Sequence, residues 1–409
     1  MGTTNVAPVR PATGQTGSPA PTYVNAIGYL RAFIVVLVVA HHAALAYYPY
    51  APPPASSLET VPRWWQAFPV VDPHRWGAAS LFVGFNDTFF MSLMFFLSGL
   101  FVWSSLRRKG SAAFLRDRLL RLGLPFLVML AVVAPLAYYP TYLQMRGHEG
   151  VGGFVRQWLS LGTWPAGPGW FLWVLLSFDC VAALLFALAP TWGESFGGRM
   201  AGIARRPAAA FAILAAISAI LYVPLALVLS PLYWSAFGPF TFQTPRILHY
   251  LAYFLIGVGV GAWGLDRGLL MPGGKLARRW LLWMVWALVA FLLLAAITMV
   301  AVASYAQSQA WAAAYDVLFA VSCAASCFAF LAFFVRFAGS RSPVFDSLSR
   351  NSYGIFLVHY AFVSWLQYAL LPASLGGWAK FPIVFIGAVA VSWGSTLAMR
   401  SIRGVSRLI

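Results

Sequence analysis

Charged side chains are scarce in this sequence of 409 residues: Asp, Glu, Lys and Arg make up 9% of it, whereas 61% is hydrophobic. A soluble protein of this length could not cover its surface with so few charges, so the composition excludes a soluble globular class. The apolar stretches are long and continuous rather than alternating, which also argues against a membrane β-barrel. A chain of membrane-spanning helices remains.

Cysteine is also scarce, and Cys180, Cys323 and Cys327 all lie inside apolar runs. This placement argues against a disulfide framework and against a CxxC metal site, because a buried cysteine is usually a small apolar filler. No set of His, Cys, Asp and Glu has the spacing of metal ligands, so no metal is expected. The sequence contains no P-loop, no GxGxxG and no GxSxG motif, which removes the commonest nucleotide-binding and serine-hydrolase classes.

Ten apolar runs follow one another along the chain, and each is long enough to cross a bilayer as a helix of about 20 residues. We therefore predict an all-α, polytopic membrane protein with about ten transmembrane helices. Residues 1–22, rich in Pro, Thr, Gly and Ala, are predicted to be a disordered cytoplasmic tail, and residues 23–403 one integral membrane domain. The runs are 26–48, 80–104, 120–141, 169–189, 208–229, 247–265, 280–303, 312–335, 351–371 and 381–400.

The net charge of +17 fits a membrane protein better than a nucleic-acid binder, because no nucleic-acid motif accompanies the basic residues. With ten helices and a cytoplasmic N-terminus, 21 of the 27 basic residues lie on the cytoplasmic side, as the positive-inside rule requires. Both termini are then cytoplasmic. Residues 49–78 form an outer loop rich in proline and aromatics, which we expect to be a structured cap. Its aromatic rings could stack on sugars or simply anchor the membrane interface.

The first run carries three ionisable groups that are costly inside a bilayer, and two of them, Arg31 and His42, are functional candidates. They are eleven residues apart, which is three helical turns plus roughly 20°, so both lie on one face with His42 about 16 Å deeper. Helical phase turns the third, His41, about 80° away from their face. His42 could be a general base, or a core histidine bonded to a carbonyl. Arg31 could mark the cytoplasmic mouth of a pore, or be an interface anchor.

The second run carries Asp87 and, eleven residues later, Ser98. Asp87 could orient His42 and fix its tautomer, as carboxylates do for many catalytic histidines, or it could be a helix N-cap. Ser98 has Gly99 beside it and no base placed to activate it. We therefore expect Ser98 to line a cavity or pack against a helix rather than act as a nucleophile.

Two arginines three residues apart, Arg118 and Arg121, share one face of a short amphipathic stretch before the third run. Such a pair can bind phosphates in a bidentate manner, or it can anchor to lipid headgroups. Asp179 and His359 are further polar residues inside apolar runs. Each could line a cavity or satisfy a contact between helices.

Together these motifs resemble the membrane acyltransferase-3 family, and the resemblance spans about residues 25–400. Arg31 and His42 look like its Arg-x10-His hallmark, and Arg118 and Arg121 look like its Arg-x-x-Arg motif. The other segments that carry the resemblance are 95–101 (Phe-Phe-Leu-Ser-Gly-Leu-Phe), the basic exit 105–109, 169–173 (Gly-Trp-Phe-Leu-Trp) and 352–359, which ends at His359. Within the family, the ten-helix build looks most like the glucan biosynthesis protein C branch.

The resemblance implies a multi-pass protein of the bacterial cytoplasmic (inner) membrane. Its reaction would transfer an acyl group from cytoplasmic acyl-CoA, acetyl-CoA before succinyl-CoA, to a hydroxyl of an extracytoplasmic or lipid-linked carbohydrate. It also implies that His42 is catalytic with Arg31 essential beside it, and that Arg118 and Arg121 lie near the donor site. We group Ser98 and His359 with the donor-binding residues and Asp87 with the catalytic ones. A homo-oligomer stays open.

Two other classes compete with the acyltransferase. A transporter or flippase for a lipid-linked sugar or small solute would explain ten helices and intramembrane His and Asp equally well, although the sequence shows no internal repeat. A structural scaffold would tolerate the loss of both Arg31 and His42. Neither alternative explains why the Arg-x10-His and Arg-x-x-Arg pairs occur together.

Overall fold

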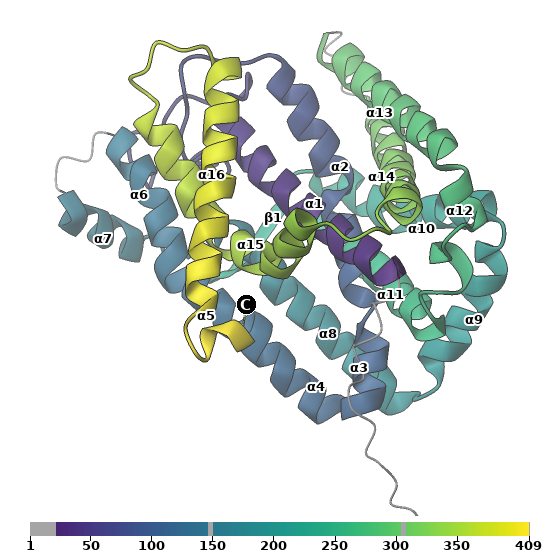
Figure 1. The fold of residues 1–409 in the computed structure, drawn as a ribbon. Coiled ribbons are helices and arrows are strands. Elements are labelled where there is room, and N and C mark those ends of the chain that lie inside the picture. Colours follow the sequence, from purple (N-terminus) through teal and green to yellow (C-terminus); the bar gives the residue numbers. More distant parts are fainter. Residues whose placement is uncertain (1–21, 146–149, 304–307, 409) are drawn as a thin grey trace, which may run out of the picture.

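The computed structural model describes residues 22–145, 150–303 and 308–408, so nearly all of the predicted tail lies outside the described part. Helices dominate it (Figure 1). They are α1 (Thr22–Leu45), α2 (Ala78–Gly99), α3 (Val102–Lys109), α4 (Ser111–Arg118), α5 (Leu124–Val128), α6 (Ala134–Gln144), α7 (Gly150–Ser160), α8 (Trp170–Leu188), α9 (Trp192–Ala204), α10 (Pro207–Leu229), α11 (Ile247–Trp263), α12 (Lys275–Arg278), α13 (Trp280–Ala303), α14 (Gln309–Phe337), α15 (Pro343–Ala369) and α16 (Gly377–Arg400).

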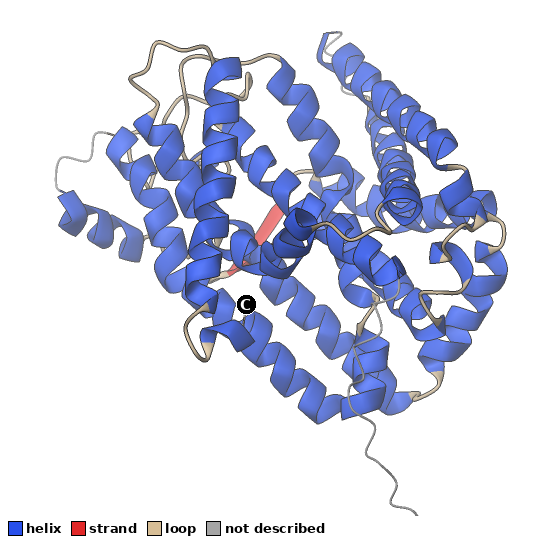
Figure 2. Ribbon diagram, in the orientation of Figure 1, coloured by secondary structure: helices blue, strands red, loops and turns tan. Residues whose placement is uncertain are grey.

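Nine helical stretches of the described chain are long and apolar enough to cross a membrane. The tenth expected span corresponds to α15, whose 27 residues would extend about 40 Å. Apolar composition alone does not identify α15 as a membrane span, because this helix carries polar groups such as Asp346, Arg350 and His359. The prediction of an all-α polytopic membrane protein is confirmed. The exception is a short antiparallel hairpin, β1 (Trp234–Phe237) with β2 (Phe240–Gln243), which Figure 2 shows near the middle of the bundle.

The bundle has two opposite ends, a basic face and a cap face. The basic face holds the ends of α3, α9 and α16. Arg107 of α3 pairs with Glu194 of α9 at 3.0 Å, and Arg400 of α16 donates to the carbonyl of Arg350 in α15. The cap face holds residues 49–77, which connect α1 to α2. In Figure 1 the cap lies at the top and α3 and α4 lie at the bottom.

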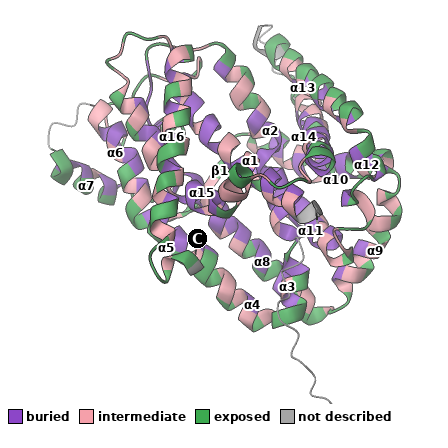
Figure 3. Cartoon of the chain, viewed as in Figure 1, coloured by how far each residue is buried: buried purple, intermediate pink, exposed green. Residues whose placement is uncertain are grey.

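Outward side chains of the bundle are apolar, as a lipid-facing surface requires. Helix α13 shows this most clearly, because a row of its large residues is exposed (Figure 3). This row comprises Leu281, Leu282, Val285, Trp286, Leu288, Val289, Leu292 and Leu293. The apolar core lies between α1, α2, α8, α11, α14 and α15, where the residues facing one another are fully buried.

The third expected span is longer than predicted and is not a regular α-helix. It runs continuously from Ser111 to Gln144 and contains two π-helical turns, η2 (Leu119–Gly123) and η3 (Met129–Val133). A π turn closes i→i+5 hydrogen bonds and is frequent at functional sites. Arg118 immediately precedes η2 and Arg121 lies within it, so the π turn sets the direction of both side chains.

Helices α2 and α11 cross in close contact because glycines remove side chains from the crossing. A methyl group added at Gly261 would lie 1.8 Å from the carbonyl oxygen of Leu100, and one at Gly257 would lie 2.2 Å from that of Phe96. Small residues of this kind allow backbones to approach in membrane bundles. These glycines therefore set how closely α2 and α11 approach each other.

We expect Gly261→Ala to destabilise the protein by about 1–3 kcal/mol, the usual cost of overpacking, because the two backbones must separate. Thermal unfolding in detergent would measure the loss. Gly84→Ala is the matched control on α2, since nothing lies within 4 Å of its added methyl group. Equal melting temperatures for the two variants would contradict the close crossing.

Candidate functional site

The centre of the candidate site is a pair of histidines from two helices far apart in sequence. His42 of α1 lies against His359 of α15, with its Nδ1 atom 3.2 Å from the Nε2 atom of His359. His359 is fully buried, whereas His42 is half-buried. The sequence placed His359 inside the membrane but could not show that it meets His42.

Backbone carbonyls fix the tautomers of both rings. His42 Nδ1 lies 2.9 Å from the carbonyl oxygen of Val38, and His359 Nδ1 lies 2.7 Å from that of Phe356. Because a carbonyl oxygen only accepts, each Nδ1 carries the proton. The one proton on His42 Nδ1 is then shared between the Val38 carbonyl oxygen and the lone pair of His359 Nε2. His42 Nε2 keeps its lone pair, with no hydrogen-bond partner among the described residues. An imidazole in this state can act as a base or as a nucleophile.

The backbone of α1 is held at the same level. Gln367 of α15 donates through Nε2 to the carbonyl oxygens of His42 (2.9 Å) and Ala43 (3.2 Å). The ring of Tyr360 lies edge-on to that of His42, with centroids 5.0 Å apart. His41 points elsewhere, against Phe90, as the helical phase predicted.

Asp87 is not where the sequence interpretation put it. Its two carboxylate oxygens accept from Nη1 and Nη2 of Arg246, at 2.9 and 2.7 Å, and the Arg246 guanidinium also lies over the ring of Phe319. The expectation that Asp87 orients His42 is therefore wrong in this structure, where His359 and a main-chain carbonyl take that place. The reason is that Arg246 follows β2 and is buried beside α2, where it needs a counter-charge.

Arg31 lies at the basic-face end of the same two helices. Its exposed side chain lines a cavity of about 250 Å³, whose other walls come from α2 and from the first turns of α15. No hydrogen bond or ion pair engages Arg31 within the described chain. The other polar lining residues are Asn25, Arg341, Asp346, Ser349 and Arg350. A basic cavity with a free guanidinium is suited to anionic ligands.

The two arginines of the Arg-x-x-Arg motif have different surroundings. Arg118 is half-buried, pairs with Asp179 of α8 at 3.3 Å and lies over Phe114. Arg121 is exposed, and its carbonyl oxygen accepts a hydrogen bond from the Tyr353 hydroxyl of α15. Asp179 is thus a helix contact, and Arg121 is the freer of the two cations. This hydrogen bond connects the Arg-x-x-Arg segment to α15. Tyr353 lies four residues after Ser349, which lines the Arg31 cavity.

Ser98 donates its hydroxyl to the carbonyl oxygen of Met94 on its own helix, at 2.8 Å. Its neighbour Leu97 lines the Arg31 cavity. The serine hydroxyl is thus occupied locally, and the structure gives it no base partner among the described residues.

Sequence reasoning gave little weight to a second buried polar cluster. His249 of α11 lies 3.0 Å from the Ser92 hydroxyl and 3.5 Å from the Cys323 thiol, and all three are fully buried. The signal was present, since His249 is ionisable and lies inside a run, but sequence could not show that α2, α11 and α14 meet there. No group of three or more metal-ligating side chains forms in the part of the chain that is described.

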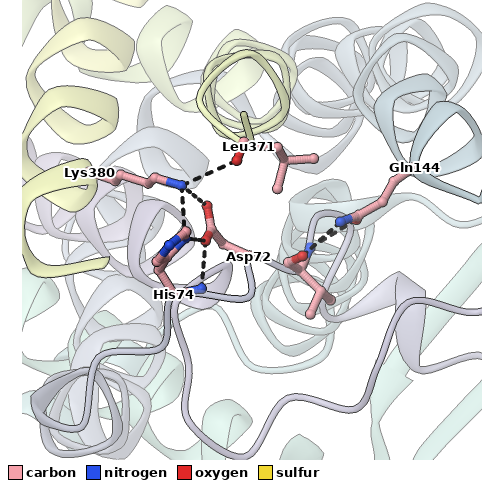
Figure 4. Close-up of polar contacts among 6 residues, drawn as sticks. Asp72, His74, Gln144, Leu371 and Lys380 are labelled. Atoms are coloured by element: carbon pink, nitrogen blue, oxygen red, sulfur yellow. Dashed lines mark hydrogen bonds and ion pairs between the residues drawn. The ribbon is translucent and has the colours of Figure 1, made fainter. Parts of the chain in front are cut away.

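The cap is anchored to two spans (Figure 4). Lys380 of α16 donates to Asp72 at 2.7 Å, and both side chains are buried. His74 also contacts the Asp72 carboxylate, while Gln144 of α6 donates to the carbonyl and accepts from the amide of Val71. The expectation of a structured cap is confirmed. It is held by these buried polar contacts and by an apolar cluster in which Leu58 and Trp65 pack against α6, α7 and α15.

The fold and the paired histidines define a polytopic membrane protein with a polar centre beneath a cap. A family model described as an acyltransferase domain matches residues 24–397. The chain therefore belongs to the acyltransferase-3 family and is a membrane acyltransferase. No curated protein and no solved structure matches it significantly.

Proposed function

We propose that this protein is an O-acyltransferase. It moves a short acyl group from cytoplasmic acyl-CoA, acetyl-CoA in preference to succinyl-CoA, to a hydroxyl of an extracytoplasmic or lipid-linked carbohydrate. The observation that carries the proposal is that α1 and α15 supply both the Arg31 cavity and the His42–His359 pair. The basic face is then cytoplasmic, in keeping with the positive-inside rule.

The donor argument rests on charge. Acyl-CoA carries several phosphate groups, and a planar guanidinium matches phosphate geometry in a bidentate manner. Arg31 has a free guanidinium inside a cavity, and Arg121 is exposed nearby along the first turns of α15. A phosphate group held at Arg31 leaves the thioester arm to reach the His42 level, about 16 Å along α1.

The chemistry follows from the free lone pair on His42. His42 Nε2 removes the proton of the acceptor hydroxyl, whose oxygen attacks the thioester carbonyl. The carbon–sulfur bond breaks, and the leaving thiolate takes the proton back from His42. In the alternative, Nε2 attacks the thioester itself, the carbon–sulfur bond breaks and the thiolate leaves. The acceptor hydroxyl then attacks the acyl carbon, the carbon–nitrogen bond breaks, and the freed Nε2 takes the hydroxyl proton and passes it to the thiolate. His359 and the Val38 carbonyl orient the ring in both versions.

The setting follows from the same proposal. A cytoplasmic donor and an acceptor beyond the bilayer place the protein in the bacterial cytoplasmic membrane. The ten-helix build favours the glucan biosynthesis protein C branch of the family.

We expect Arg31→Ala to weaken acetyl-CoA binding about 10- to 100-fold, because a hydrogen bond to a charged group contributes roughly 1.5–3 kcal/mol. Titration of the protein in nanodiscs would measure this dissociation constant. Arg279→Ala, at an exposed arginine between α12 and α13, is the matched control and should bind as the wild type does. If folded wild-type protein binds neither acetyl-CoA nor succinyl-CoA, the acyl-CoA proposal fails and solute uptake becomes the next assay.

A further inference from the structure

The cap encloses a cavity of its own, about 370 Å³ in volume, between residues 52–71 and the end of α6. It lies on the cap face, whereas the Arg31 cavity lies at the other end of α1. His42 is on the same helix between them. Two cavities on opposite faces of one histidine centre suit a reaction with two substrates that arrive from different sides.

The lining of this cavity combines an aromatic surface with short polar groups. Trp64 is 52% exposed at its wall, beside three consecutive prolines at 52–54. The hydroxyls of Ser56 and Thr60 lie 3.1 Å apart at the same wall. Sugars present an apolar ring face bordered by hydroxyls, so an aromatic plane with a few small hydroxyl side chains is complementary to them.

A buried polar atom also lacks a partner at this cavity. Thr141 of α6 lines it and is only 3% exposed, yet its hydroxyl has no hydrogen-bond partner within the described chain. An orphaned buried hydroxyl is costly, and a ligand hydroxyl would satisfy it.

The wall of the cavity is connected to His42 by a series of aromatic rings in edge-to-face contact. Trp65 is buried with its ring 5.3 Å from that of Tyr138, whose hydroxyl lies 3.4 Å from the hydroxyl of Tyr360. Tyr360 in turn lies against His42. Both tyrosine hydroxyls donate to one cap carbonyl, that of Gln66, at 2.9 and 3.4 Å. The turn η1 (Trp64–Gln66) is thus hydrogen-bonded to both tyrosine side chains that lie between Trp65 and His42.

The contacts of Figure 4 hold the cap residues around this cavity in place. Gln144 lines the cavity and is hydrogen-bonded to Val71. The next residue of the cap, Asp72, is held by Lys380. Arg63, just before η1, donates to the Thr163 hydroxyl and the Leu161 carbonyl. A preformed site loses little conformational entropy on binding.

We propose that the cap cavity is the binding site for the acyl acceptor, a carbohydrate, with Trp64 as its stacking platform and the Tyr138–Tyr360 pair as the passage to His42. The assignment rests on the proposed acyltransferase function. The cap cavity would then bind a substrate that membership of the acyltransferase-3 family does not specify.

The test separates acceptor binding from donor chemistry. The probes are cellobiose, maltose and N-acetylglucosamine, added to the protein in nanodiscs while acetyl-CoA hydrolysis without sugar is followed in parallel. We expect saturable binding of at least one probe, weakened 10-fold or more in Trp64→Ala and several-fold in Thr141→Val, whereas the control variant keeps both the sugar binding and the donor hydrolysis of the wild type. Trp378→Ala is the matched control, since Trp378 is 70% exposed at the start of α16 and does not line the cap cavity.

Each outcome tests either the cap site or the donor proposal. If no probe binds to protein that hydrolyses acetyl-CoA, or if Trp64→Ala and Trp378→Ala bind the sugar equally, the cap assignment is wrong while the acyltransferase stands. If hydrolysis is absent but a sugar binds at Trp64, the site stands and the donor proposal fails. Comparing each soluble sugar with the same sugar on a lipid in the nanodisc then separates a free acceptor from a lipid-linked one.

Discussion

Replacing His42 by alanine is expected to lower the rate of acyl transfer, and of the slower donor hydrolysis, by about 10²–10⁴-fold, the usual contribution of a positioned general base. The effect is large because the tautomer that leaves Nε2 free is fixed by two neighbours, the Val38 carbonyl and His359. Turnover of acetyl-CoA by the protein in nanodiscs would measure it. Both the general-base and the acyl-histidine mechanisms require this atom.

The adjacent histidine supplies the control. His41 belongs to the same helix turn but lies against Phe90, so His41→Ala should retain most of the activity. Full activity in His42→Ala would contradict both mechanisms. Rapid quenching of the wild type with labelled donor distinguishes them, because only the acyl-histidine mechanism leaves label on the protein.

Asp87→Ala is expected to cost about 3–5 kcal/mol of folding stability, because it leaves the Arg246 guanidinium buried without a counter-charge. Arg246 is 1% exposed, and both of the charged contacts to it described above come from Asp87. Thermal unfolding in detergent, followed by tryptophan fluorescence, would measure the loss. The double variant Asp87→Ala/Arg246→Met should recover much of it, because the stranded charge is then gone.

This experiment also decides between two interpretations of Asp87. If Asp87 is a structural partner of Arg246, Asp87→Ala loses stability, and its activity falls only as the folded fraction falls. A residue that orients His42 predicts normal melting and a large drop in turnover per folded molecule. The second pattern would contradict the pairing seen in the structure.

The spans could be predicted from sequence because the bilayer imposes a length and a composition on each helix. Helical phase separated His41 from His42. The polar sequence of α15 still allowed its detection, since the run 351–371 was apolar enough, but its first two turns were missed. The hairpin was missed because its two strands are only four residues each.

Partners between helices could not be predicted, because periodicity gives the face of a helix but not its neighbour. His42 and His359 are separated by 317 residues, and nothing in either segment specifies the other. The same limit applies to Asp87, which is separated from Arg246 by 159 residues, and to Asp72 and Lys380. Polar groups inside apolar runs and the family resemblance supplied the candidate residues, whereas only three-dimensional packing determined which of them meet.

The two π turns of the third span have a consequence for how the length of this helix can change in evolution. Each π turn holds one residue more than an α turn, so deletion of one residue within 119–123 or 129–133 lets that turn close as regular α-helix. The helix on either side then keeps its faces toward the same neighbours. A deletion elsewhere in the span instead rotates everything beyond it by about 100°, turning lipid-facing leucines toward the core. Single-residue gaps among homologues should therefore concentrate at these two turns.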